Sequence, residues 1–134
     1  MLRQRERDAA FAVILSRAPR VLLVQKADGR WGLPGGGIRR GESPREAVLR
    51  ELQEETGLRA SGAALVGKLR RAGSRAFVFV LTKRGLRGQL LGRTREILRQ
   101  RWVRPGRARR LLTNGNALRF EMALPHALRL LRQA

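Results

Sequence analysis

Hydrophobic residues follow different spacings in different parts of the chain, and these spacings predict strands in some segments and helices in others. The segments Ala9–Ser16 and Arg20–Lys26 are rich in Val, Ile and Leu, and Ala18-Pro19 between them favours a turn. They are therefore predicted to be a pair of strands. Four glycines and a proline punctuate Trp31–Gly37, which predicts a short strand that leads into a loop.

The clearest helix signals lie between Ser43 and Gly57. Ser43 is a favourable N-cap residue, and Glu46 completes a capping box with it. Pro44 suits the first helical position, and Gly57 supplies the C-terminal stop. These residues predict a helix over Pro44–Thr56.

The second half of the chain continues the alternation of strands and loops. The predicted elements are strands at Ala63–Arg71, Ser74–Lys83 and Arg99–Val103, a loop at Gly85–Gly92, and a helix at Asn116–Gln133 that is interrupted near Pro125. Apolar residues occupy both faces of Ser74–Lys83, which favours a central position in the sheet. The elements predict an α/β fold with a mixed sheet flanked by helices, in one domain spanning residues 1–134.

Charge is distributed unevenly along the chain, whose formal net charge is +20. Eight of the ten acidic residues precede Arg59, whereas the remainder holds 19 Lys or Arg residues and only Glu96 and Glu121 as acids. Such a surface attracts nucleotides, nucleic acid or anionic membranes. Arginine binds phosphate through two donors, but a genome-wide codon bias would give the same arginine content, and both explanations stay open.

Composition excludes several classes of protein. The chain has no cysteine, so disulfides and thiolate metal sites are excluded. No secretory signal is visible, and the longest apolar runs are far too short for a membrane span. A cytoplasmic protein without membrane association is expected, as a monomer or a dimer.

Three carboxylates gather on one side of the predicted helix. At about 100° per residue, Glu51, Glu54 and Glu55 share an arc of about 100°. Their mutual repulsion should raise their pKa values, and a hard cation such as Mg²⁺ or Mn²⁺ would relieve it. The alternative is a solvated helix face with Glu–Arg pairs at helical spacing.

The residues around these carboxylates resemble the signature of the Nudix hydrolase family. Gly36, Glu42 and the run Arg50–Leu58 match every fixed position of its box, and Leu33–Gly36 is similar to the lead-in to that box. The resemblance implies a Nudix-type α/β/α sandwich. It also implies a Mg²⁺- or Mn²⁺-dependent hydrolase that cleaves a phosphoanhydride bond in a nucleoside diphosphate derivative.

The resemblance also implies roles for individual residues. Glu51, Glu54, Glu55 and the carbonyl of Gly35 would bind metal, Arg50 would orient a glutamate, and Glu42 would lie in the outer shell. Glu51 and Glu54 are candidates for the general base.

Glu96 is a third candidate for the base or for a metal ligand. It precedes Trp102 by six residues, which is similar to the placement of a late glutamate in MutT-like members. The alternative is that Glu96 only pairs with neighbouring arginines.

The substrate is less clearly marked in the sequence. Markers of several Nudix subgroups are absent, which leaves a MutT-like (d)NTP pyrophosphohydrolase as the favoured interpretation. The candidate substrate-binding residues are Lys26, Gly35, Gly36, Asn114 and Asn116. Lys26 has a plain surface lysine as its alternative, and each asparagine has a turn residue or a helix N-cap. A rival hypothesis is an Arg-rich protein on the same scaffold that binds RNA or DNA, or that processes RNA 5′ ends.

Overall fold

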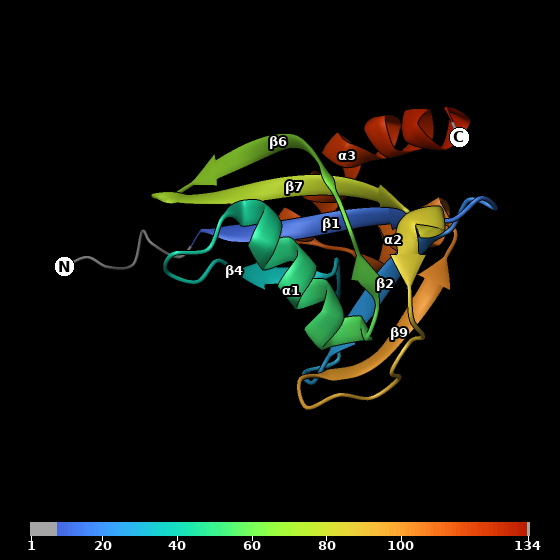
Figure 1. The fold of residues 1–134 in the computed structure, drawn as a ribbon, viewed down its shortest axis with the longest axis horizontal. Coiled ribbons are helices and arrows are strands. Elements are labelled where there is room, and N and C mark those ends of the chain that lie inside the picture. Colours follow the sequence, from blue (N-terminus) through green and yellow to red (C-terminus); the bar gives the residue numbers. More distant parts are fainter. Residues whose placement is uncertain (1–7, 134) are drawn as a thin grey trace.

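Two parallel strands from distant parts of the chain, β1 (Ala9–Leu15) and β7 (Ser74–Thr82), run side by side at the centre of the sheet (Figure 1). The computed structural model describes residues 8–133. Every residue of β1 is in parallel register with β7, from Ala9 opposite Ala76 to Leu15 opposite Thr82. The central position expected for the Phe-containing strand is therefore confirmed.

Antiparallel strands extend this centre on both sides into a seven-stranded mixed sheet. β6 (Ala64–Arg71) pairs with β7, and β4 (Gly35–Gly37) pairs with the start of β1. The remaining strands extend from the same edge of β1 as β4, opposite β7, and they are β2 (Val21–Lys26), β3 (Trp31–Gly32) and β9 (Ile97–Val103). β2 pairs with β1, β3 and β9. The mixed sheet predicted from the sequence is confirmed.

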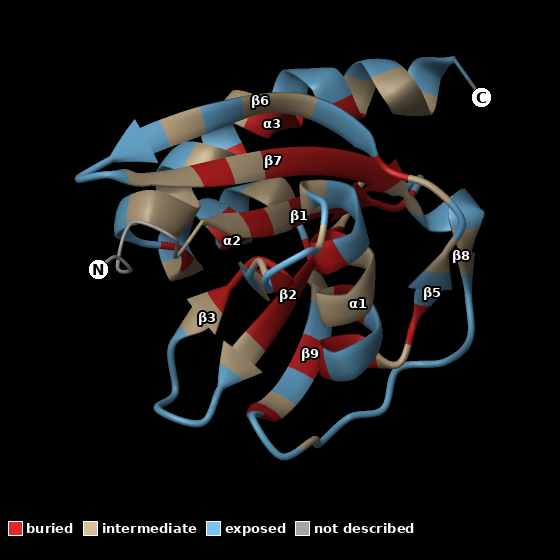
Figure 2. Cartoon of the chain, turned by 60° about the vertical axis from the view of Figure 1, so that its left-hand side comes forward, coloured by how far each residue is buried: buried red, intermediate tan, exposed pale blue. Residues whose placement is uncertain are grey.

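Helices cover the two faces of the sheet. α1 (Pro44–Thr56) packs against β1 and β4 on one face, and α3 (Asn114–Arg132) packs against β7 and β1 on the other. The side chains of β7 alternate between the two layers, because Val78 and Val80 belong to the core below α3 while Phe79 belongs to the core below α1. Burial is concentrated in these central strands, whereas β6 is largely exposed (Figure 2).

The C-terminal helix differs from its prediction in two respects. It begins at Asn114 rather than Asn116, with Thr113 as the N-cap residue, and it continues through Pro125 without interruption. A proline inside a helix removes one intrahelical hydrogen bond, and its ring crowds the carbonyl four residues earlier, so packing must offset this cost. Buried Ala123 and Ala127 on either side of Pro125 pack into the same core, which holds both halves of the helix in line.

Several short elements were not predicted. They are α2 (Pro105–Leu111), the 3₁₀ helix η2 (Lys83–Gly85), and the strands β5 (Arg59–Ala60) and β8 (Leu86–Arg87), which pair with each other. α2 has a single buried residue, Ala108, so its sequence lacks the apolar periodicity that identifies longer helices. Within residues 8–133, no helix has the length and hydropathy needed to cross a membrane.

Candidate functional site

Local signals fix both ends of α1 where the sequence predicts them. The backbone N–H of Glu46 donates to Oγ of Ser43 at 3.0 Å, and the backbone N–H of Ser43 donates to the Glu46 carboxylate at 2.9 Å. At the other end, Gly57 adopts a left-handed conformation with φ of 85°, and its N–H donates to the carbonyl of Gln53. These caps fix which residues of the helix face the sheet.

Two glycines of β4 lie directly against the acidic face of α1. The backbone N–H of Gly35 donates a 2.9 Å hydrogen bond to Oε1 of Glu55. A Cβ at Gly36 would lie 2.8 Å from Cδ of Glu51 and would collide with its carboxylate oxygens. The absence of a side chain at Gly36 therefore allows Glu51 to approach β4, whereas a Cβ at Gly35 would collide with Ala10 and Phe11 of β1.

Arg50 links the acidic residues to one another. Its Nε and Nη2 atoms donate to the two carboxylate oxygens of Glu42 at 2.6 and 3.0 Å, and Nη2 also donates to the carbonyl of Gly37 at 3.0 Å. Its Nη1 atom lies 3.2 Å from Oε1 of Glu54 and 3.4 Å from Oε2 of Glu51. The guanidinium thus holds three carboxylates in one network, two from α1 and one from the loop that precedes it.

The two carboxylates nearest the glycines have altered acidity. Burial raises the pKa of Glu55 to about 8, although the hydrogen bond from Gly35 lowers it. Burial also raises the pKa of Glu51, partly offset by the charge of Arg50. By contrast, the Arg50 hydrogen bonds lower the pKa of Glu42 to about 2.

Glu96 and Lys26 lie close enough to influence this site. The negative charge of Glu96 raises the pKa of both Glu51 and Glu55, whereas the positive charge of Lys26 lowers that of Glu55. Both residues are exposed. Lys26 ends β2, and Glu96 directly precedes β9, so the β2–β9 pairing brings them to the edge of the acidic face.

The donor atoms of this face suit a hard divalent cation. They are carboxylate and carbonyl oxygens, which Mg²⁺ prefers. Glu51 and Glu54 already converge on one positive group, the Arg50 guanidinium, and burial disfavours the charged form of Glu51 and Glu55 unless a cation compensates it. Among residues 8–133, no three Asp, Glu or His side chains are gathered as an ion-holding cluster.

The absence of a three-residue cluster has a visible cause in the side-chain directions. The carboxylate of Glu55 is turned toward the N–H of Gly35, and that of Glu54 lies between Arg50 and Arg39, with Nη2 of Arg39 3.7 Å from its Oε2. The acidic face therefore fits a cation by the chemistry and placement of its residues, and ligation by all three glutamates requires rotation of their side chains.

A buried glutamine supports the end of α1 and was not identified from the sequence. Nε2 of Gln100 donates to the carbonyl of Glu55 at 2.8 Å, and Oε1 of Gln100 accepts from the N–H of Gly92 at 2.7 Å. It joins β9 and the Gly92 loop to the helix residue whose carboxylate faces Gly35. A glutamine in a strand has no sequence signature for such a role.

The two candidate asparagines lie on the other side of the sheet from α1. Nδ2 of Asn116 packs against Gly32, and its Oδ1 accepts a 3.2 Å hydrogen bond from Arg119. Asn114 is exposed and has a positive φ of 51°. Neither residue is the helix N-cap, because that position belongs to Thr113.

A half-buried arginine borders Asn116 and was also missed. The guanidinium of Arg119 stacks 4.1 Å from the ring centroid of Phe11, and burial lowers its pKa. Phe11 also contacts Gly35. The chain of contacts from Asn116 through Arg119 and Phe11 to Gly35 thus connects the two faces of the sheet around β4.

Comparison with known proteins relates this arrangement to one family. A family model of the NUDIX domain matches residues 5–123. A Bacillus subtilis protein provisionally named an 8-oxo-dGTP diphosphatase is 35% identical over 99 residues, which cover 73% of this chain and 66% of that protein. An RNA pyrophosphohydrolase of Thioalkalivibrio sulfidiphilus is 48% identical over 60 residues, which cover 43% of this chain and 35% of that protein.

These alignments span less than two thirds of either relative. Among solved structures, the MutT protein of Bacillus halodurans superimposes with a TM-score of 0.70 and 25% identity, covering 87% of this chain and 79% of that one. The sequence match and the structural superposition therefore point to the same family. This chain belongs to the NUDIX domain family.

Proposed function

We propose that this protein is a Mg²⁺- or Mn²⁺-dependent pyrophosphohydrolase that cleaves a phosphoanhydride bond of a nucleoside 5′-triphosphate. The observation that supports this most strongly is the contact between β4 and α1, in which Gly35 binds Glu55 and Gly36 packs on Glu51. The glycines of β4 add no side chains beside the carboxylates of α1, which would leave room there for both a cation and a phosphate chain.

Each acidic residue has a separate part in this proposal. Glu51, Glu54, Glu55 and the carbonyl of Gly35 would hold the metal, with Glu96 as a further ligand or base at the edge. When bound, the divalent ion neutralises the phosphate charge and lowers the pKa of the attacking water. Glu51 and Glu54 are the other candidates for accepting the proton of that water.

Arg50 is a positioning residue in this scheme. It makes four hydrogen bonds, to Glu42, Gly37 and Glu54, and an ion pair with Glu51, so it would fix their orientation instead of contacting the substrate. Glu42, whose pKa is lowered to about 2 by Arg50, stays ionised and anchors the guanidinium.

The remaining candidates would contact the nucleotide. Lys26, whose charge acts on Glu55, is positioned to bind a phosphate of the substrate. Asn116 offers an amide donor and acceptor for a base edge, and Asn114 stands exposed at the start of α3. Gly35 and Gly36 would admit the phosphates close to the backbone.

Two related substrates share the 5′-triphosphate group. The Bacillus subtilis relative is named for 8-oxo-dGTP, which supports a free nucleotide, and the Thioalkalivibrio relative is named for RNA, which supports the 5′ end of a transcript. A free (d)NTP is the primary proposal, because the match to the first relative covers more of this chain.

The proposal is tested by turnover of a nucleotide panel with a matched pair of variants. Glu54→Gln removes one carboxylate from the acidic face. Glu121→Gln removes one carboxylate from α3, where Glu121 forms an exposed ion pair with Arg109 of α2. Glu54→Gln should lower kcat by about 10²–10⁴-fold, whereas Glu121→Gln should retain activity. Equal activity of the two variants, with both folded by circular dichroism, would exclude a role for the acidic face.

A further inference from the structure

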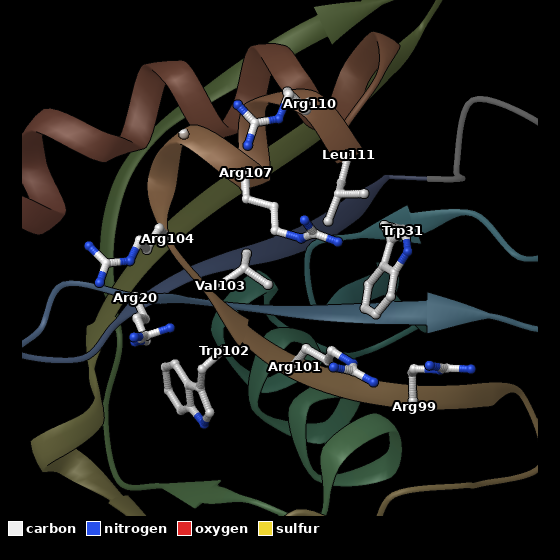
Figure 3. Close-up of a pocket in the computed structure, with 11 residues that line it drawn as sticks. Arg20, Trp31, Arg99, Arg101, Trp102, Val103, Arg104, Arg107, Arg110 and Leu111 are labelled. Atoms are coloured by element: carbon white, nitrogen blue, oxygen red, sulfur yellow. The ribbon is translucent and has the colours of Figure 1, made fainter.

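A second feature of the molecule lies away from the acidic face of α1. A groove of about 720 Å³ runs between the edge strand β9 and the short helix α2 (Figure 3). Its arginines come from both walls and from the end of the β1–β2 turn, and they are Arg20, Arg99, Arg101, Arg104, Arg107 and Arg110. No aspartate or glutamate lines it.

The strand register explains why these arginines converge. In β9, Arg101 lies opposite Leu23 of β2, whose side chain belongs to the core on the α3 side of the sheet, so Arg101 emerges on that side. Arg99 follows at a spacing of two. Figure 3 shows Arg107 reaching from α2 toward Trp31, with Arg101 and Arg99 on the facing wall.

These positive charges have no partner to neutralise them within the described part of the chain. The ion pairs found between residues 8 and 133 use other arginines, such as Arg50, Arg75 and Arg109. Six arginines lining one groove repel one another, and a polyanion with regularly repeated charges removes that repulsion.

Aromatic side chains occur among the arginines. Trp31 and Trp102 both border the groove, and they are the only two tryptophans of the chain. Trp31 packs on the same side of the sheet as Arg101, whereas Trp102, opposite Leu22, packs on the α1 side. A partly exposed ring beside a positively charged track, as Trp31 provides here, suits single-stranded nucleic acid, because a base can stack on the ring while arginines follow the phosphates. A membrane surface is flat and would not enter a groove.

We propose that this groove binds the phosphodiester backbone of single-stranded RNA, whose 5′ end is then presented to the acidic face of α1. Binding of RNA by the groove stands on the groove alone, and presentation of the 5′ end rests on the RNA substrate named under the proposed function. Trp31 precedes Gly35 by four residues, which places their Cα atoms at most about 14 Å apart. Because the groove arginines lie on the α3 side and the acidic face lies on the α1 side, the RNA would pass from one to the other around the sheet edge at β3, a span of a few nucleotides.

The test uses tryptophan fluorescence as the reporter. The chain has no tyrosine and only two tryptophans, and Trp31 lies on the side of the groove arginines, so quenching of the Trp31 emission reports occupancy of this region. The probe is an oligouridylate with a 5′ hydroxyl, added in the presence of EDTA, so that binding is measured without hydrolysis. The double variant Arg101→Gln/Arg107→Gln removes one arginine from each wall.

The matched control is Arg59→Gln/Arg87→Gln, which removes the same charge from the exposed β5–β8 pair. The groove variant should bind the oligouridylate roughly tenfold more weakly, and the slope of log K against log salt should fall by about 1.4, since each neutralised phosphate contributes about 0.7 on a single strand. The control should keep the affinity apart from a small effect of net charge.

Three results would overturn the inference. They are the absence of quenching in the wild type, an equal loss of affinity in both double variants, and binding of phosphatidylserine vesicles in preference to the oligouridylate. Failure of the proposed function gives a different pattern, in which the oligouridylate binds with the expected salt slope while the wild type hydrolyses no nucleoside triphosphate and no triphosphorylated RNA.

Discussion

Nε of Arg50 donates a 2.6 Å hydrogen bond to Oε2 of Glu42, and this contact ties the loop ahead of α1 to the acidic face of that helix. Both side chains are largely buried, with 17% and 16% of their surfaces exposed. The same guanidinium approaches Glu51 and Glu54 through its Nη1 atom. The position of the carboxylates therefore depends on the planar geometry of one arginine.

Replacement of Arg50 by lysine keeps the charge and removes that geometry. An ammonium group is a single point charge and cannot hold Glu42, Gly37 and the glutamates of α1 at once. Arg50→Lys should lower kcat/KM by about 10–100-fold, as is typical when the support of a metal ligand is lost. Steady-state kinetics would measure this against Arg45→Lys, an exposed position of the same helix, and equal rates for the two variants would contradict it.

Adjacent glycines of β4 provide a second matched pair. A methyl group at Gly36 would displace the carboxylate of Glu51, whereas a Cβ at Gly37 has no other atom within 4 Å. Gly36→Ala should lower kcat/KM by about 10–100-fold with little change in Tm, because the displaced group is the end of a flexible side chain. Gly37→Ala should behave as the wild type in both measurements. A Gly36→Ala enzyme with full activity would show that the position of Glu51 is unimportant.

Gln100 is expected to affect stability as well as the site. Gln100→Leu leaves the buried carbonyl of Glu55 and the N–H of Gly92 without their partners, which should cost about 1–3 kcal/mol of unfolding free energy. Urea denaturation would measure the loss. Gln89→Leu, at an exposed position, is the control, and a Gln100→Leu protein as stable as this control would refute the structural role.

Asp8 provides a pH-dependent contribution to stability outside the site. It accepts hydrogen bonds from the backbone N–H and the guanidinium of Arg75 at 2.7 to 3.0 Å. Burial alone would raise the pKa of Asp8, but its hydrogen bonds and the charge of Arg75 together hold it below 3.8. A carboxylate whose pKa is lower in the folded state than in the unfolded state stabilises the fold at pH values above its unfolded-state pKa. This contribution is lost as the pH falls through the folded-state pKa.

The corresponding variant is Asp8→Asn. At pH 7 it should lower the unfolding free energy by about 1–2 kcal/mol, and its difference from the wild type should shrink as the pH falls below 3.8. Denaturant unfolding at a series of pH values measures both quantities. A difference that stays constant down to the lowest pH would show that ionisation of Asp8 is not the cause.

The sequence was most informative where short-range chemistry determines structure. Ser43, Glu46 and Gly57 act within one turn of the helix ends, so they predicted Pro44–Thr56 correctly. Contacts between distant segments were not foreseeable in this way. Gln100 meets the carbonyl of Glu55 only because β9 joins the sheet beside β2.

Side-chain directions were also beyond the helical wheel. The wheel grouped Glu51, Glu54 and Glu55, and their repulsion predicted raised pKa values, but it did not show that burial would be the larger cause at Glu55 while Glu54 stays half exposed. It also did not show that the loop carrying Glu42 would cover the guanidinium of Arg50, because that loop is separate from the helix. Burial by a neighbouring loop is a tertiary effect that periodicity does not contain.

The most direct measurement is turnover of a nucleoside triphosphate panel by the wild type, first in excess EDTA and then after Mg²⁺ or Mn²⁺ is restored. If the acidic face of α1 and the glycines of β4 form a metal-dependent site, hydrolysis should cease in EDTA and return with the cation, with release of pyrophosphate or phosphate from the triphosphate chain. Undiminished hydrolysis in EDTA would contradict this account.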